Sequence, residues 1–185
     1  MSEYQYYEFQ AIDRPLTHDQ MAELRSLSTR ARITAISFVN EYHWGSFKGD
    51  PDQLMERYFD AFLYFANWGT RHLMLRLPAR LLTPTAVEPY CDGRSLSYRV
   101  KGEYMILSFL SETEGYDGED DGGELSSLIP LRADLLRGDY RCLYLGWLLT
   151  VQNAEVDDGA TEPPVATGVE ELERLLAGLG RFLAH

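Results

Sequence analysis

The residues best suited to binding or catalysis gather in two short segments, residues 40–50 and 67–72. The candidate binding residues in these segments are Asn40, Glu41, His43, Trp44, Trp68 and Arg71. Tryptophan and arginine dominate binding hot spots because each presents a large contact area together with a polar group. A glycine follows each tryptophan and permits close approach of another backbone. We therefore predict that the two segments form a recognition surface. The alternative, that both tryptophans are core residues, stays open.

Glu41 and His43 form the one arrangement that resembles a catalytic pair. Residues two apart on a strand share a face, where a carboxylate can orient an imidazole for proton transfer. No serine, cysteine or threonine stands beside them in a recognised nucleophile motif. A polar strand end that satisfies its own hydrogen bonds has the same pattern, as does a binding patch. We therefore assign no catalytic residue, and an enzyme of unrecognised type using Glu41, His43 and Arg71 is kept as an alternative.

The sequence contains no motif for a phosphate, a dinucleotide or a metal ion. The glycine-rich patterns that cradle phosphates at the start of a helix are absent. The acidic segment 117–124 has a glycine at its sixth position, but the twelfth residue from Asp117 is Leu128, where a calcium loop needs glutamate. Cys91 and Cys142 have no Cys or His neighbour at metal-ligand spacing, which is typical of reduced structural thiols. We expect no cofactor and no metal.

The chain of 185 residues carries a net charge of −12 at pH 7. An acidic surface repels nucleic-acid phosphates, so we expect no direct nucleic-acid binding. The acidic runs at residues 112–124 and 155–162 leave another role open, that of an acidic nucleic-acid mimic or inhibitor. The start of the chain lacks the pattern of a signal peptide, and no apolar run approaches the length of about 18 residues that suggests a membrane span. We therefore expect a cytoplasmic protein with no membrane contact.

Residues 51–67 give the clearest helix signal in the sequence. Asp50 is a favourable N-cap residue, and Pro51 suits the first helical position because its missing N–H is not needed there. Apolar side chains inside the segment form a broad stripe at helical spacing, and Gly69 follows as a stop signal. The pattern predicts a central buried helix.

Alternating apolar side chains predict the strands, and capping signals predict the remaining helices. We expect strands over residues 4–12, 32–44, 71–77, 96–100 and 103–110, the last two as a hairpin. We expect further helices over residues 18–28, 133–136 and 139–151. Thr17 and Gln20 form a capping box at the start of the first of these helices. A strand over residues 139–151 stays open because the segment is rich in aromatic and β-branched side chains.

This order of elements indicates an α+β fold with one antiparallel or mixed sheet of about five strands. We expect the helices on one face of the sheet, a ferredoxin-like core as the specific topology, and additional C-terminal helices. The expected regions are an α+β core over residues 1–152, an acidic proline-containing linker over 153–167 and an amphipathic helix over 168–185.

The C-terminal helix offers a second way to bind a partner. Its apolar side chains form a heptad seam made of Val169, Leu172, Leu176, Leu179 and Leu183. Such a seam can engage a helix of another protein. Residues 169–183 are therefore the predicted partner-binding segment.

Three phrases of the sequence are distinctive. They are Tyr-Glu-Phe-Gln-Ala-Ile-Asp-Arg-Pro-Leu at residues 7–16, Phe-Val-Asn-Glu-Tyr-His-Trp-Gly at residues 38–45 and Ala-Asn-Trp-Gly-Thr-Arg at residues 66–71. The phrases resemble a family of uncharacterised bacterial proteins, and the likeness extends over nearly the whole chain. The resemblance implies no activity, since none is established for the family. It also implies further helical sequence after a helix such as residues 169–184, so we expect an N-terminal domain or a natural short form.

The missing motifs, the acidic composition and the heptad seam favour a non-catalytic protein-binding or regulatory module of a bacterial cytosolic system. The enzyme of unrecognised type and the acidic mimic are the alternatives. A partner that co-purifies would favour the module or the mimic, whereas a pocket around a histidine with a shifted pKa would favour the enzyme.

Overall fold

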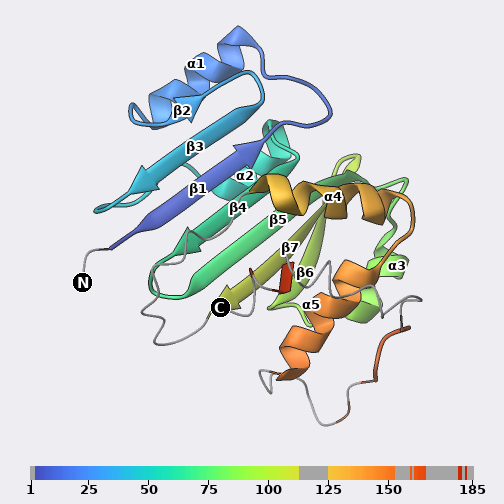
Figure 1. Cartoon of the computed structure of the whole chain (residues 1–185). Helices are drawn as coiled ribbons and strands as arrows, with labels where there is room; N and C mark the ends of the chain where they lie inside the picture. The colour runs from blue at the N-terminus through green and yellow to red at the C-terminus, as the bar shows by residue number, and fades with distance from the viewer. Residues whose placement is uncertain are drawn as a thin grey trace.

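A seven-stranded antiparallel sheet organises the chain, with helices packed on both of its faces (Figure 1). The computed structural model describes residues 3–112, 125–152, 159, 161–165, 179, 180 and 182. The strands are β1 Gln5–Gln10, β2 Arg32–Ile33, β3 Ser37–Tyr42, β4 Ala61–Ala66, β5 Thr70–Pro78, β6 Leu96–Lys101 and β7 Tyr104–Glu112. The helices are α1 His18–Leu27, α2 Pro51–Arg57, α3 Pro84–Val87, η1 Glu88–Tyr90, α4 Leu125–Leu136 and α5 Arg141–Gln152. The strand order is β2-β3-β1-β4-β5-β7-β6. None of the helices in the described part of the chain is long and apolar enough to cross a membrane.

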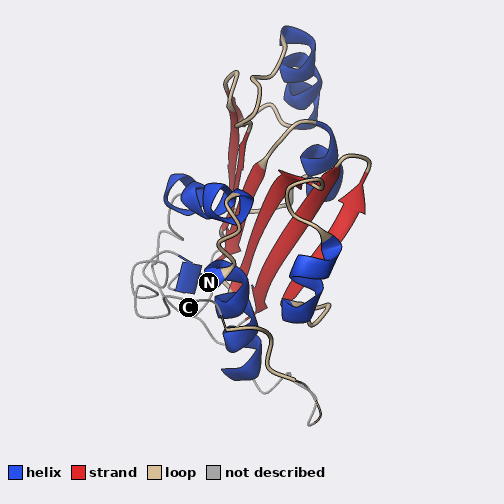
Figure 2. Ribbon diagram, turned by 90° about the vertical axis from the view of Figure 1, so that its right-hand side faces the viewer, coloured by secondary structure: helices blue, strands red, loops and turns tan. Residues whose placement is uncertain are grey.

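The predicted α+β class is confirmed, but the detailed topology is wrong. The sheet has seven strands instead of about five, and its order does not match a ferredoxin-like core. The helices also cover both faces of the sheet instead of one (Figure 2). On β5, Leu73 and Leu75 point into one core and Met74 into the other. Because apolar side chains leave the central strands in both directions, each face needs its own cover.

Each face of the sheet has a defined set of helices. We call the first the α1 face, where α1 and α2 pack through Leu24, Leu54 and Met55. We call the second the α4 face, where α4 and α5 pack through side chains such as Leu128 and Leu143. The two layers shield the middle of the sheet from water.

The predicted helix over residues 51–67 is the main error of the sequence analysis. Its start is correct, since Asp50 caps α2 by accepting hydrogen bonds from the N–H groups of Asp52 and Gln53. The helix ends at Arg57, however, and β4 follows. β4 is buried on both faces, so its apolar residues form a continuous run in place of an alternating one. Such a run cannot be distinguished from a buried helix by its periodicity.

Gly69 and the predicted strand over residues 32–44 also differ from expectation. Gly69 does not end a helix but lies in the β4–β5 turn with a φ of 102°, which favours glycine. The expected strand is divided into β2 and β3 by a tight turn. The hydroxyl of Thr34 accepts hydrogen bonds from the N–H groups of Ile36 and Ser37 at 3.2 and 3.0 Å, which turns the chain locally.

The other predicted elements are confirmed, with shifted bounds. The Thr17–Gln20 capping box is present at the start of α1. β6 and β7 form the expected hairpin, with Gly102 at a φ of 58° in its turn. The segment after Asp139 is helical, so the strand alternative is wrong. α4 begins eight residues before the predicted start at residue 133, because Leu125 and Leu128 already face the core.

Most of the predicted linker and C-terminal helix lies outside the described residues, as does the acidic segment 117–124. Leu179 is an exception, because it is fully buried in the core of the α4 face, and Phe182 lies beside it in the same core. One residue of the predicted heptad seam therefore packs against the chain's own sheet domain. The other four seam residues and the three-region division stay predictions.

Candidate functional site

Four neighbouring strands bring the two predicted binding segments to the same end of the sheet. Gln5 at the start of β1 lies opposite both Tyr42 at the end of β3 and Ala66 at the end of β4. The segments that follow Tyr42 and Ala66 therefore leave the sheet side by side, separated only by β1. Since adjacent strands lie about 4.8 Å apart, their backbones are about 10 Å apart at this end. We call this surface, made of Tyr4, His43, Trp44, Asn67 and Trp68, the aromatic end.

Trp44 is the most exposed large apolar side chain of the described residues, with 67% of its surface accessible. The guanidinium of Arg30 lies 5.5 Å from the centre of its ring, a cation–π contact. The following residue, Gly45, has a φ of 79° and accepts a hydrogen bond of 2.9 Å from the side-chain amide of Gln5. The backbone beside the exposed indole is therefore held to β1.

Trp68 is 45% exposed, so both tryptophans lie at the surface and neither is a core residue. Its indole N–H donates a hydrogen bond of 3.1 Å to the hydroxyl of Thr70. The neighbouring Asn67 is tied to β1, since its side-chain oxygen accepts from the N–H of Tyr4 and its own N–H donates to the carbonyl of Tyr4. Trp68 therefore lies in a β4–β5 turn that hydrogen bonds between Asn67 and Tyr4 hold to β1.

An aromatic row connects this end of the sheet with the core of the α4 face. The exposed ring of His43 lies 5.3 Å from the ring of Tyr4, which lies 5.6 Å from Phe65. Tyr6 stacks on the same phenylalanine at 5.2 Å. Burial raises the pKa of Tyr4, and the nearby Glu41 raises it further, so its hydroxyl stays protonated at neutral pH. The row is aromatic, and the hydroxyls of Tyr4 and Tyr6 give it a polar component.

Glu41 and His43 do not form the catalytic pair considered from the sequence. The carboxylate of Glu41 lies 3.3 Å from the guanidinium of Arg32 across the β2–β3 ladder, in an exposed ion pair. His43 instead contacts Tyr4. Exposed ion pairs contribute little to stability, so this one acts mainly on the local charge.

Asn40 and Arg71 are the two predicted site residues that the structure buries. Asn40 donates hydrogen bonds to the hydroxyls of Ser28 and Tyr42 on the α1 face, at 2.8 and 2.7 Å. Arg71 lies on the α4 face, with its guanidinium 5.7 Å from the ring centre of Phe182. Neither side chain is accessible to a partner in this conformation. Both make contacts within the chain beneath the surface.

His72 and Ser108 form a pair that resembles a base and its nucleophile. Their Nε2 and Oγ atoms lie 2.7 Å apart on the α1 face. Burial lowers the pKa of His72 to about 4; Asp52 opposes this shift and Arg99 adds to it. A base with so low a pKa accepts a proton poorly at neutral pH. The pair is therefore better interpreted as a partly buried structural hydrogen bond.

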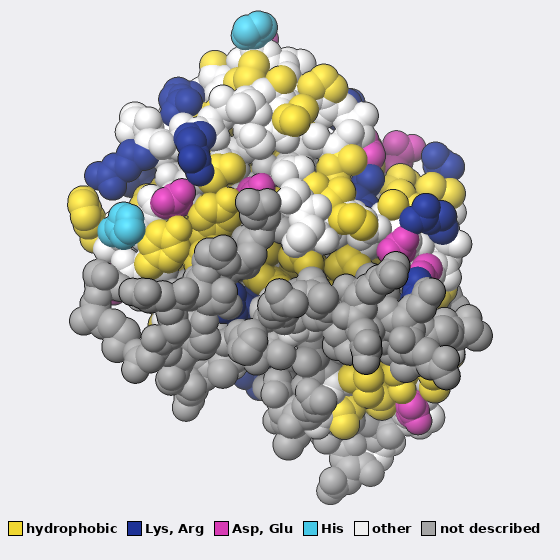
Figure 3. All heavy atoms as spheres, viewed as in Figure 1, with side chains coloured by type: hydrophobic (Ala, Val, Ile, Leu, Met, Phe, Trp, Pro, Cys, Tyr) yellow, Lys and Arg dark blue, Asp and Glu magenta, His cyan; other side chains and the backbone are white. Residues whose placement is uncertain are grey.

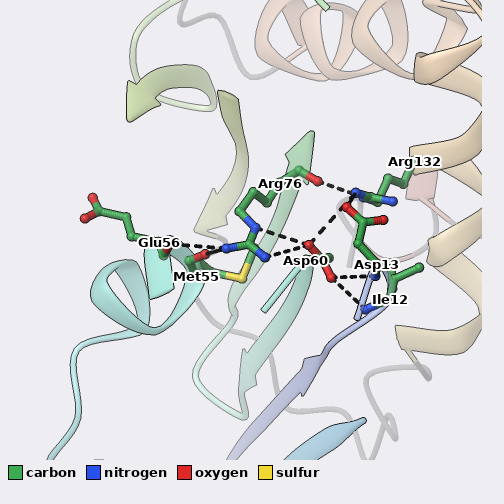
Figure 4. Close-up of polar contacts among 7 residues, drawn as sticks. All are labelled: Ile12, Asp13, Met55, Glu56, Asp60, Arg76 and Arg132. Atoms are coloured by element: carbon green, nitrogen blue, oxygen red, sulfur yellow. Dashed lines mark hydrogen bonds and ion pairs between the residues drawn. The ribbon is translucent and has the colours of Figure 1, made fainter. Parts of the chain in front are cut away.

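A buried charge network occupies the opposite end of the sheet (Figure 4). Asp60, which is 1% exposed, accepts hydrogen bonds from the N–H groups of Ile12 and Asp13 at 2.6 and 2.9 Å. Its other oxygen accepts from Nε and Nη2 of Arg76 at 3.1 and 2.8 Å. We call this network, made of Asp13, Asp60, Arg76 and Arg132, the charge end.

The arginines of the charge end connect four elements. Arg76 on β5 donates from Nη1 to the carbonyls of Met55 and Glu56 near the end of α2, and its guanidinium lies 4.6 Å from the ring centre of Tyr104. Arg132 on α4 donates to the carbonyl of Arg76 at 2.7 Å and pairs with Asp13 at 2.6 Å. Sequence reasoning missed this network, although Asp60 and Arg76 each stand out as a lone charge in an apolar run.

Two hollows open on the surface, and the first lies beside the charge end. One of about 350 Å³ is lined by Asp13, Pro78, Ala79, Arg80, Glu103 and Tyr104. The other, of about 500 Å³, contains Arg137 and Arg141, whose guanidinium groups pair with Asp134 and Asp139. The guanidinium groups of Arg137 and Arg141 are therefore already paired within the chain. Neither hollow combines a nucleophile with a base.

Neither a metal site nor a protein family can be assigned to the described part of the chain. Within the described ranges, no group of three or more His, Cys, Asp or Glu side chains has the geometry to hold a metal ion. Comparisons with protein-family models, with curated proteins and with solved structures found no match. The resemblance of the three sequence phrases to a bacterial family therefore stays a prediction.

Proposed function

We propose that this protein is a non-catalytic protein-binding or regulatory module of a bacterial cytosolic system, and that the aromatic end is its recognition surface. The observation that carries the proposal is the exposure of Trp44 and Trp68 at one end of the sheet, 67% and 45%. Exposed tryptophans next to arginine and tyrosine are the composition of binding hot spots.

The rigidity of the aromatic end supports this role. Gln5 holds the backbone at Gly45, and Tyr4 holds the backbone at Asn67, while both indoles stay accessible. A partner that binds such a surface loses little free energy in ordering it, because the strands have already fixed the backbone. The site is therefore suited to protein recognition without a large conformational change.

The enzyme alternative has weaker support. Glu41, His43 and Arg71 do not converge on one reacting position, since the first pairs with Arg32 and the last is buried. The seam at residues 169–183 is also a weaker candidate for the partner contact than the aromatic end, because Leu179 lies in the chain's own core.

A pull-down from the native host, read by mass spectrometry, tests the proposal. The parent protein is compared with folded Trp44→Ala and Trp68→Ala variants, and any captured partner is then purified and titrated against each variant by calorimetry. We expect each substitution to weaken binding at least about tenfold, the usual scale of a hot spot. Ile36→Ala is the matched control, because Ile36 is 58% exposed but lies in the β2–β3 turn. Undiminished binding by both tryptophan variants would place the recognition surface elsewhere.

A further inference from the structure

The outer edge of β3 is open beside Trp44. The carbonyl of Ser37 accepts a hydrogen bond of 2.9 Å from the N–H of Thr34, so the main-chain groups of Ser37 point toward β2. Main-chain direction alternates along a strand, so Val39 and Glu41 point the same way. β2 pairs with Val39 through Arg32 and begins there. Among the described backbone contacts, none occupies the N–H and carbonyl of Glu41 on this edge.

The charge around this open edge is opposite to the charge of the protein as a whole. Between Glu23 and Glu41 the charged residues are Arg25 on α1, Arg30 just after it and Arg32 on β2, and Glu41 pairs with Arg32. Figure 3 shows Lys and Arg side chains gathered at the upper left, over α1, β2 and β3, close to an exposed His. The chain carries a net charge of −12, so this local excess of positive charge is a distinct feature of its surface. Such a surface attracts a negatively charged partner.

Two of the arginines have fixed positions. Arg30 lies over the ring of Trp44 at 5.5 Å, and Arg25 donates a hydrogen bond of 2.6 Å to the carbonyl of Ala31. The open main-chain groups, the arginines and the exposed indole are therefore held beside one another at a single edge.

We propose that this edge binds an extended acidic segment of another protein, which adds to β3 at Glu41 as a further strand. This inference rests on the proposed function and names the chemistry of the partner. Main-chain hydrogen bonds to an open edge give affinity, and alternate side chains give specificity. Val39 and Glu41 point their side chains to the α4 face, as Arg32 does opposite Val39. The bound segment places an acidic residue at every second position, facing Arg32 and Arg30, and Trp44 packs against an apolar residue of the segment.

Fluorescence anisotropy with synthetic peptides tests this proposal. The probe is a fluorescein-labelled peptide of four Glu-Val repeats, and the comparison peptides are four Lys-Val repeats and a Glu-Val peptide methylated on its backbone nitrogens. We expect only the unmodified acidic peptide to bind, and to bind more weakly as NaCl rises from about 50 to about 300 mM. Lys-Val binding equal to Glu-Val binding would overturn the charge assignment. Unchanged binding of the methylated peptide would overturn the added strand.

Variants locate the binding at the edge. Trp44→Ala and Arg30→Ala should each raise the Kd of the acidic peptide at least about fivefold, the scale of one lost charge-assisted or stacking contact. Glu41→Gln should lower the Kd about twofold to threefold, because it removes an acidic group that repels the peptide at the open edge. Arg14→Ala is the control, since it removes an equal charge from an exposed position after the other end of β1. Equal effects of Arg14→Ala and Arg30→Ala would overturn the proposal.

Two further outcomes separate this inference from the proposed function. A single-stranded oligonucleotide of thymidines that competes more strongly than the acidic peptide would assign the edge to nucleic acid and overturn the inference. Failure of the acidic peptide to bind also overturns it. If a native partner still requires Trp44 in that case, the proposed function stands and only its acidic chemistry is wrong.

Discussion

The two ends of the sheet use their residues in opposite ways. At the charge end, Asp60, Arg76 and Arg132 are buried and satisfied by partners within the chain. At the aromatic end, Trp44 and Trp68 are exposed, and hydrogen bonds hold the neighbouring residues Gly45 and Asn67. Buried charges and exposed large aromatic side chains both depart from the usual distribution of residues, so each calls for a specific reason.

The reason differs between the two ends. Burying the charges stabilises the fold only because every charge has hydrogen-bond partners, so the charge end is a junction of strands and helices. Large exposed side chains contribute little to folding, so the position of the tryptophans is consistent with the recognition role that we propose. The comparison predicts that substitutions at the charge end change stability, whereas substitutions at the aromatic end change binding.

The largest expected effect is that of Asp60→Ala. Removal of this carboxylate leaves the guanidinium of Arg76 buried and two N–H groups without their acceptor. Breaking a buried ion pair on one side costs about 3–5 kcal/mol of the free energy of unfolding. Urea denaturation followed by circular dichroism measures the loss. A loss below about 1 kcal/mol would mean that the network is not a structural junction.

Acid should destabilise the protein through His72, which lies between the two ends on β5. Its pKa is about 4 in the folded state and 6.5 when unperturbed. Above pH 6.5 both states hold a neutral imidazole, and the full stability is present. As the pH falls toward 4 the unfolded state takes up the proton first, so stability is lost by up to about 3 kcal/mol.

The histidine contribution can be separated from other acid effects by substitution. His72→Gln should abolish the part of the acid sensitivity that falls between pH 6.5 and about 4. His43→Gln, which removes an exposed histidine at the aromatic end, should leave it in place. Thermal melts at several pH values give the comparison, and parallel pH profiles of the parent and His72→Gln would contradict the assignment.

Asp13→Ala should have a smaller effect than Asp60→Ala. The carboxylate of Asp13 is 42% exposed, although it pairs with the buried guanidinium of Arg132 at 2.6 Å. Water can replace it there, and Arg132 keeps its hydrogen bond to the carbonyl of Arg76. We expect a loss of about 1 kcal/mol in the free energy of unfolding. A loss equal to that of Asp60→Ala would show that the network depends on its exposed member as strongly as on its buried one.

The smallest effect on folding is expected at the aromatic end. Trp44→Ala and Trp68→Ala should change the free energy of unfolding by no more than about 0.5 kcal/mol, since exposed substitutions away from buried contacts are nearly neutral. The same variants should lose partner binding. A loss of stability comparable to that of Asp60→Ala would remove the distinction between the two ends.

The exposure of the candidate binding residues was only partly predictable from the sequence. Composition alone pointed to His43, Trp44 and Trp68, and the structure leaves all three exposed. Composition could not distinguish these exposed residues from the buried Asn40 and Arg71, because the exposure of a side chain depends on which other segments pack over it. Arg71 is buried under Phe182, more than a hundred positions further along the chain.

The sequence predicted correctly those features that depend only on residues close together in the chain. The Thr17–Gln20 capping box, the Asp50 cap and the β6–β7 hairpin all involve residues only a few positions apart. The sequence by itself therefore determined the α+β class, several element starts and the concentration of candidate binding residues in two short segments.

Only the tertiary structure decided the sheet order, the conversion of residues 61–66 into a central strand and the pairing of Asp60 with Arg76 and Arg132. The apolar run of β4 suits a buried helix and a buried strand equally well, and its position between β1 and β5 makes it a strand. Arg132 reaches the charge end from a helix 72 positions after Asp60. Such contacts depend on how distant segments pack together, which no local pattern of residues specifies.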